Sequence, residues 1–239
     1  SSYSQNIDTT VMPNGVVYVV AKIYDAVGNF TYSPKQRYMC DNQGPEQVKN
    51  VKCIAVDGTT ATLSWSDVSD DDISYFVVEC KQSDGVWKSV SRTSTNLGVN
   101  LSGLTPEHDY VYRVIGYDKR SNRGTPSEEI TVTTLKDTIC PKVTKITPDP
   151  GYFKSEINLR FTAEDDYRVK SIEIQTSTDK ESWKTVSEIK ATGESAKCTF
   201  DCKLDLKNYE EGSVFVRAKV YDSYGNVTED KDLTCYEYV

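Results

Sequence analysis

The sequence of 239 residues predicts an all-β fold made of tandem β-sandwiches, of which the first is incomplete. Three observations lead to this prediction. Alternating apolar runs recur along the chain, and three of them end in a Tyr-Asp pair with an Asn four residues after the Asp. The Asp positions are 93 and 104 residues apart, which is the length of one β-sandwich domain. The three copies run from Asp25 to Asn29, from Asp118 to Asn122 and from Asp222 to Asn226.

The first and third copies are closely related. Residues 17–31 and 214–228 are identical at nine of fifteen positions. In both, every second residue of the run is apolar, which predicts a half-buried strand with its apolar side inward. Gly28 and Gly225 can adopt a positive φ, which a tight hairpin needs before its return strand. Both segments are therefore expected to be the penultimate strand, the turn and the last strand of a sandwich.

Residues 1–44 are too few for a whole sandwich. Only 23 residues precede Tyr24, which is enough for a final hairpin and too short for the four or five strands that should come before it. Either the chain is a fragment of a longer protein, which we favour, or another molecule completes this part.

Residues 45–135 are predicted to form a whole sandwich. Val48 and Val51 are expected to open its first strand, and residues 61–65 to form the second with Trp65 in the core. The third strand is expected at residues 73–78.

The most specific motif follows in the same segment. Leu104-Thr105-Pro106, then Tyr110, then Arg113-Val114, resembles the turn into the sixth strand of the fibronectin type III domain. The resemblance covers residues 45–135 and implies that Tyr110 forms a tyrosine corner, with its hydroxyl bonded to upstream backbone. Pro106 sets φ at the turn, and the ring of Tyr110 is expected to be buried.

Residues 136–239 are predicted to form another whole sandwich, with strands at 157–161 and 169–174. This segment resembles the bacterial immunoglobulin-like domains strung along secreted and surface proteins. By its similarity to this segment, residues 1–44 are expected to be the C-terminal part of an immunoglobulin-like β-sandwich. The predicted fold is therefore a tandem of immunoglobulin-like and fibronectin type III β-sandwiches.

Composition excludes several partners. The net charge of −8 argues against nucleic acid, whose phosphates require clustered Lys and Arg. No run approaches the roughly 20 apolar residues of a membrane-spanning helix.

Seven cysteines make an odd set, so at least one has no partner within the chain. Most are expected to be small buried residues, and Cys140 with Cys235 is the pair that we would test.

No catalytic signature is found. His108 is the only histidine, and no nucleophile or orienting acid lies near it in the sequence, so an exposed loop residue is expected. The repeated Asp25, Asp118 and Asp222 are expected to be structural, because an Asp at the entry to a tight turn binds backbone two residues later. We therefore predict no catalytic residues and no cofactor.

Acidic residues gather in two corresponding loops, before the third strand of each complete sandwich. Oxygen ligands at such a position can hold Ca²⁺, particularly if Asp41 or Asp137 of the preceding linker joins them. The candidate ligands are Asp70, Asp72, Asp165 and Asp166. The spacing does not match an EF-hand loop, and a solvated polar loop without a metal is the favoured alternative.

These observations predict a non-enzymatic region of a larger secreted or cell-surface protein, acting as a spacer, a scaffold or a protein-interaction module. Its expected partners are other domains of the parent protein and a protein or glycan ligand. The alternatives are a carbohydrate-binding or adhesion module, and accessory C-terminal domains of a secreted glycosidase or protease. The fold itself does not choose among them.

Overall fold

The computed structural model describes residues 4–68, 70–229 and 234–239. In this part, the regular structure consists of β-strands and one short 3-10 helix. The chain divides into two compact units, and each is described by itself. The first comprises the residues up to Ala55 together with Thr62–Leu101 and Tyr110–Val132. The second comprises Val56–Ala61, Ser102–Asp109 and the residues from Thr133 onward.

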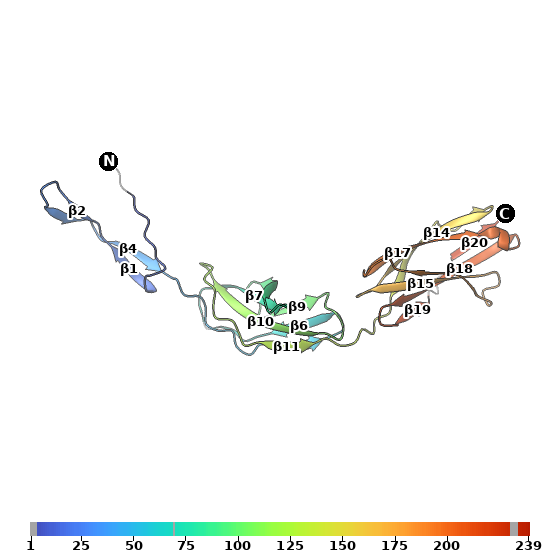
Figure 1. The fold of residues 1–239 in the computed structure, drawn as a ribbon, viewed down its shortest axis with the longest axis horizontal. Coiled ribbons are helices and arrows are strands. Elements are labelled where there is room, and N and C mark those ends of the chain that lie inside the picture. Colours follow the sequence, from blue (N-terminus) through green and yellow to red (C-terminus); the bar gives the residue numbers. More distant parts are fainter. Residues whose placement is uncertain (1–3, 69, 230–233) are drawn as a thin grey trace. The chain divides into compact units, whose positions relative to one another are not determined.

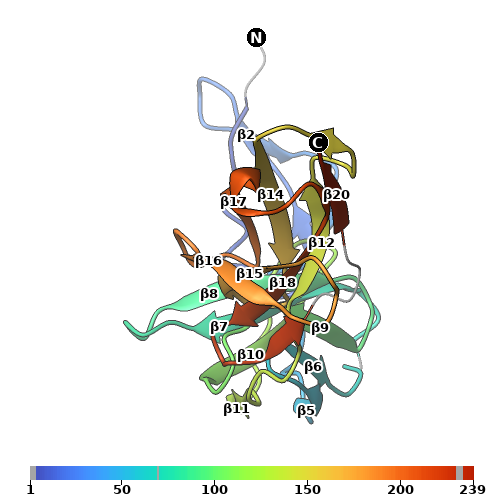
Figure 2. The same cartoon turned by 90° about the vertical axis from the view of Figure 1, so that its right-hand side faces the viewer.

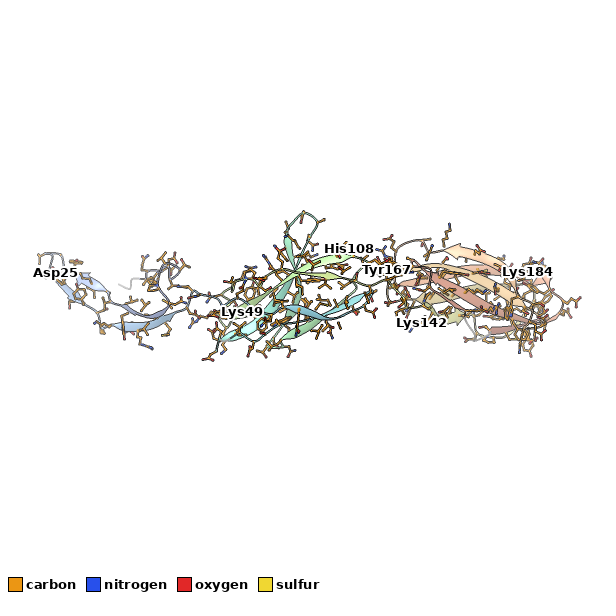
Figure 3. The ribbon with its side chains drawn as sticks, turned by 90° about the horizontal axis from the view of Figure 1, so that it is seen from below. Asp25, Lys49, His108, Lys142, Tyr167 and Lys184 are labelled. Carbon is orange, nitrogen blue, oxygen red and sulfur yellow. The ribbon has the colours of Figure 1, made fainter. Side chains whose placement is uncertain are left out.

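The N-terminal segment forms a hairpin with two antiparallel ladders (Figure 1). Its strands are β1 (Gly15–Val19), β2 (Lys22–Tyr24), β3 (Phe30–Tyr32) and β4 (Gln36–Cys40). Strand β1 pairs with β4, and β2 pairs with β3. Asp25 lies in the turn that joins β2 to β3 (Figure 3).

The middle segment forms two sheets. The four-stranded sheet has the order β11 (Ile130–Thr133), β10 (Asp109–Asp118), β7 (Ile73–Lys81) and β8 (Trp87–Thr93). The three-stranded sheet has the order β5 (Lys52–Val56), β6 (Thr60–Ser64) and β9 (Gly98–Ser102). Trp65 lies in the core, as predicted, with its ring edge-on to Phe76 at a centroid distance of 5.6 Å.

The first strand of this segment begins later than the sequence predicts. Val48 is buried as a core residue, yet the regular strand starts only at Lys52. Asn50 between them has φ of 56°, a left-handed conformation that interrupts an extended strand.

The C-terminal segment is also a two-layer sandwich (Figure 2). One sheet has the order β12 (Lys142–Thr147), β14 (Glu156–Glu164) and β17 (Lys197–Asp205). The other has the order β13 (Tyr152–Phe153), β20 (Thr234–Tyr238), β18 (Gly212–Asp222), β15 (Val169–Ser177) and β16 (Lys184–Lys190), with β19 (Val227–Glu229) also paired to β18. The 3-10 helix η1 (Leu206–Asn208) follows β17. Phe161, Phe200 and Ile172 pack between the layers as part of one continuous core.

The hairpin of the N-terminal segment repeats the pairing of the C-terminal one. Ile23 pairs with Thr31 in the first, and Val220 pairs with Thr228 in the second. Burial differs completely, because Ile23 is 56% exposed whereas Val220 is fully buried. The predicted half-buried strand is confirmed for β18, whereas in the N-terminal segment it holds only for β1, where Val17 and Val19 are half-buried, and β2 is exposed throughout. In the C-terminal segment β15 pairs with the other side of β18 and the sheet β12–β14–β17 covers its face; within the described residues 4–44, β1 pairs with β4 alone.

The tandem β-sandwich fold predicted from the sequence is confirmed.

All seven cysteines are free, so the pair Cys140–Cys235 is not formed. Cys40, Cys80 and Cys202 are buried, and the other four are half-buried or exposed, so the prediction that most are buried is wrong. None of the described segments forms a helix with the length and hydrophobicity needed to cross a membrane.

Candidate functional site at two aspartate triads

The repeated Asp organises the turn that follows it. Asp222 ends β18, and its Oδ1 accepts hydrogen bonds from the backbone N–H groups of Tyr224 and Asn226, both at 2.8 Å. Its Oδ2 accepts from the side-chain amide Nδ2 of Asn226 at 2.6 Å. The same three bonds occur at Asp118 and at Asp25, so one local structure recurs in all three segments.

The residue before each Asn adopts a positive φ. Gly28 and Gly225 have φ of 94° and 89°, and Ser121 occupies the equivalent place in the middle segment with φ of 68°. Glycine adopts a positive φ without a steric penalty, whereas serine adopts it at an energetic cost because of its Cβ. The middle turn therefore keeps its conformation despite an unfavourable residue.

In the two complete sandwiches, the Asn side chain also binds the preceding linker. Nδ2 of Asn122 donates to the backbone carbonyl of Asp41 at 3.0 Å. Nδ2 of Asn226 donates to the backbone carbonyl of Asp137 at 3.2 Å. In this arrangement, which we call the linker clamp, the turn at the end of a strand holds the segment that leads into the same sandwich.

The linker clamp brings three carboxylates together in each sandwich. The first triad is Asp41, Asp72 and Asp118, and the second triad is Asp137, Asp165 and Asp222. One carboxylate oxygen from each residue lies within 4.8 Å of the others in the same triad. The members come from the linker, from the loop before the third strand and from the repeated Asp. Like charges at such distances repel, by about 4 kcal/mol at 4 Å with an effective dielectric constant of 20.

In the second triad, two oxygens have no hydrogen-bond partner. Oδ1 of Asp137 accepts from the backbone N–H of Ile139 at 2.9 Å, while its Oδ2 is buried and unpaired. Oδ2 of Asp165 accepts from the N–H groups of Tyr167 and Arg168, while its Oδ1 is buried and unpaired. Buried carboxylate oxygens without a partner are unfavourable, so both need a proton, water or a cation.

Burial changes the proton affinity of this triad. Burial raises the pKa of Asp137, and the nearby carboxylates of Asp166, Asp222 and Asp57 raise it further, against the opposing effect of the Ile139 N–H. Burial also raises the pKa of Asp165, with the Tyr167 and Arg168 N–H groups acting in the opposite direction. The guanidinium of Arg168 does not compensate the charge of the triad, because it forms an ion pair with Glu194 at 3.0 Å. Both shifts mean that the charged forms are disfavoured without a positive partner.

The first triad is more open and has a basic neighbour. Asp41 and Asp72 are half-buried, and Nε of Arg120 lies 3.5 Å from Oδ2 of Asp41. The pKa of Asp72 is raised mainly by its hydrogen bond with Asp70, and burial adds to this. The two triads therefore share positions but differ in how their charge is compensated.

The predicted calcium candidates divide into two groups. Asp72 and Asp165 lie in the triads, together with the linker residues Asp41 and Asp137. Asp70 instead accepts the N–H of Asp72 at 3.3 Å, and the exposed Asp166 accepts the hydroxyl of Thr59 at 2.9 Å. The sequence patterns assigned Asp118 and Asp222 to turn formation only and did not reveal that each is also a member of a triad. Asp41 and Asp137 each precede a proline by four residues, Pro45 and Pro141, and this shared linker pattern was the available signal.

Other predicted residues are placed as follows. His108 is exposed in the loop before β10 (Figure 3). Tyr110 is half-buried and its ring stacks on that of Tyr112 at a centroid distance of 5.9 Å, so Tyr112, only 1% exposed, is the tyrosine that the core encloses. The hydrogen bond predicted for the hydroxyl of Tyr110 stays a prediction.

Comparison with known proteins identifies the middle segment. Residues 46–133 match the family of the fibronectin type III domain. The segment is thus a fibronectin type III domain, as the motif from Leu104 to Val114 predicted. No curated protein sequence matches the chain.

Three of the solved structures to which this chain is similar are the following. The fibronectin type III domain of human fibronectin type III domain containing protein 3 is 25% identical, with a TM-score of 0.37, covering 41% of this chain and 94% of that one. The domains FN1–FN3 of chicken CNTN1 are 16% identical, with a TM-score of 0.38, covering 82% and 67%. The FN5 domain of Drosophila Lar is 21% identical, with a TM-score of 0.33, covering 39% and 99%.

Proposed function

We propose that this chain is a non-catalytic region of a larger secreted or cell-surface protein, in which tandem β-sandwiches act as a scaffold and present a protein-interaction surface. Fibronectin type III domains in tandem resemble spacer or interaction modules of multidomain proteins. In this proposal, residues 1–44 are the C-terminal part of an immunoglobulin-like sandwich, and 45–135 and 136–239 are complete modules.

The linker clamp is the observation that carries the scaffold function. The same Asn-to-carbonyl hydrogen bond recurs at Asp41 and at Asp137, and each joins the entry of a sandwich to its own turn. A segment held in this way has less conformational freedom than a free linker. Repetition of the bond in two modules of different sequence supports a role in controlling the joins.

The interaction surface that we propose is the solvent side of the four-stranded sheet in the middle domain. Tyr75 and Tyr117 stack at a centroid distance of 4.8 Å with nearly parallel rings, and the guanidinium of Arg92 lies 3.6 Å from the centre of Tyr75. On the same sheet, the guanidinium of Arg113 lies 4.0 Å from the centre of the Trp87 ring. Tyr, Trp and Arg are the residue types most enriched among those that dominate the energy of protein–protein binding.

Three exposed aromatic residues beside the β2–β3 turn of the N-terminal hairpin are less suited to glycans. Tyr24, Phe30 and Tyr32 are all more than half exposed, with Lys22 next to them. Their rings are inclined by 55° and 75° to each other. A sugar ring stacks on a flat platform, so this geometry favours the protein-interaction proposal over the carbohydrate alternative.

Cross-linking of the native protein in its source tests the proposal. Lys81 lies at the edge of the proposed surface, with its Nζ 5.5 Å from the centre of the Trp87 ring, and a lysine-specific reagent is expected to join it to a second polypeptide. Replacing Arg92 and Trp87 by Ala should remove these cross-links, while Lys81 still reacts with a small reagent. An activity of the isolated chain that required one of its own side chains would contradict the proposal.

A further inference from the structure

The second triad combines features that a polar surface loop does not need. Three carboxylates converge from separate parts of one unit, and Asp137 and Asp222 are 1% and 0% exposed. Acidic residues are seldom buried unless a positive group compensates them. Within the described residues, no lysine or arginine forms an ion pair with any of the three.

The unused acceptor sites of the three carboxylates point to one shared occupant. Oδ2 of Asp137 and Oδ1 of Asp165 are buried and accept no hydrogen bond. Asp222 accepts two bonds at Oδ1 and one at Oδ2, and a carboxylate has about four acceptor sites, so one site on Oδ2 remains. Each residue therefore has an oxygen available for the same occupant, and the other oxygen is fixed by backbone N–H groups or by Asn226.

The dimensions suit a calcium ion. Calcium binds oxygen at 2.3–2.6 Å, so two of its ligands lie at most roughly 4.6–5.2 Å apart. The second triad satisfies this limit, since one carboxylate oxygen from each of its three residues lies within 4.8 Å of the others. Carboxylates are hard ligands that calcium prefers, and water or backbone carbonyls commonly complete its six to eight positions.

We propose that Asp137, Asp165 and Asp222 bind one Ca²⁺ ion, which joins the linker to the loop before β15 and to the end of β18. The linker clamp prepares this site, because Asn226 holds both the carboxylate of Asp222 and the backbone of Asp137. The first triad is the matched comparison, since it has the same three positions but more exposed acids and Arg120 beside Asp41.

Terbium luminescence reports directly on this site. Tb³⁺ occupies calcium sites and emits when neighbouring aromatic rings absorb light. The rings of Tyr167 and Tyr224 lie 5.8 Å apart, and each of these residues donates its backbone N–H to a carboxylate of the triad. Tb³⁺ added to the full chain is expected to show tyrosine-sensitised emission that Ca²⁺ displaces and equimolar Mg²⁺ does not.

The variant Asp137→Asn removes one ligand charge with almost no change in shape. Calorimetry is expected to show at least about tenfold weaker Ca²⁺ binding and no rise of the melting temperature with millimolar Ca²⁺. Because the substitution also removes like-charge repulsion, the calcium-free variant should melt no lower than the wild-type chain, which shows that it is folded.

Two controls remove the same charge elsewhere. Asp166→Asn changes the neighbour of Asp165 that accepts from Thr59, and Asp72→Asn changes the loop position of the first triad, which is equivalent to Asp165. Both should keep the Ca²⁺ binding that Asp137→Asn weakens. Absence of heat and of a melting shift with millimolar Ca²⁺, unchanged binding by Asp137→Asn, or equal stabilisation by Mg²⁺ would overturn the proposal.

Discussion

The side-chain amide of Asn226 joins the backbone carbonyl of Asp137, at 3.2 Å, to the carboxylate of Asp222, at 2.6 Å. Asn226 is 89 positions from Asp137 and four positions from Asp222, so a local turn motif provides a long-range contact. Asn122 repeats this with Asp41 and Asp118. The Asp-to-Asn motif is therefore both a turn former and the means by which each complete sandwich holds its entering segment.

Removing the amide tests this linker clamp. Asn226→Ala leaves the buried carboxylate of Asp222 with one bond fewer and the Asp137 carbonyl without this donor. We expect a loss of about 2 kcal/mol in the free energy of unfolding of the C-terminal sandwich, because a bond to a charged group and a neutral bond are both lost. Urea denaturation measures it. Asn29→Ala, in the exposed N-terminal turn, should leave the same transition unchanged.

Ser121 offers a substitution that should stabilise the protein. Its φ of 68° is unfavourable for any residue with a Cβ, and the equivalent positions carry Gly28 and Gly225. Ser121→Gly is expected to raise the unfolding free energy of the middle domain by about 0.5–1 kcal/mol, after the greater chain entropy of glycine in the unfolded state is subtracted. Thermal melting compares the two proteins. The reverse change, Gly225→Ser, should lower the stability of the C-terminal sandwich.

Equivalent positions of the repeat should respond differently to truncation. Val220→Ala removes two methyl groups from a fully buried side chain and is expected to cost about 2 kcal/mol. Ile23→Ala, at the matching and exposed position, should change the free energy of unfolding by less than about 0.5 kcal/mol. Equal effects in chemical denaturation would contradict the exposed position of Ile23.

Two ion pairs of the middle domain should differ in strength. Glu79 accepts from Nε of Arg113 at 2.7 Å and lies 2.6 Å from its Nη2, with only 14% of the Glu79 side chain exposed. Glu79→Ala is expected to destabilise the domain by about 2 kcal/mol, because Arg113 loses the carboxylate oxygen Oε2 that both its Nε and its Nη2 contact. Glu129→Ala breaks the exposed pair with Lys81 and should have an effect below about 0.5 kcal/mol. Equilibrium unfolding of both variants measures the difference.

Alkaline pH should destabilise the C-terminal sandwich through Tyr236. Burial raises the pKa of Tyr236 to about 12, whereas the ordinary value is 10. Between these values, the folded chain keeps a proton that the unfolded chain has lost, so stability decreases as the pH rises from 10 to 12. The loss approaches about 3 kcal/mol above pH 12.

Tyr236→Phe isolates this contribution. The variant removes the hydroxyl that donates to the Pro148 carbonyl at 2.8 Å, so we expect it to be about 1 kcal/mol less stable at pH 7. Its stability should then fall less steeply between pH 10 and 12 than that of the wild-type chain. Denaturation midpoints measured across this pH range give both quantities, and identical slopes would assign the alkaline loss to other groups.

Local sequence patterns predicted most of the fold. Alternation located the strands around Leu63, Phe76, Leu159 and Ile172, because a half-buried strand has the same two-residue period wherever it occurs. The motif from Leu104 to Val114 identified the fibronectin type III domain, now supported by the family match over residues 46–133. The predicted start of the first strand of this domain was wrong, since the left-handed conformation of Asn50 has no signature in the alternation.

The β-sandwich modules, their tandem order and the turn that each Asp-to-Asn motif forms could be predicted, because they depend on residues close together in the chain. Which of the matching patterns are buried depends on long-range packing, as the contrast between Ile23 and Val220 demonstrates. Long-range packing also selects which of the many acidic residues meet. Asp137, Asp165 and Asp222 converge through the packing of strands distant in sequence, and a period of two carries no information about such distances.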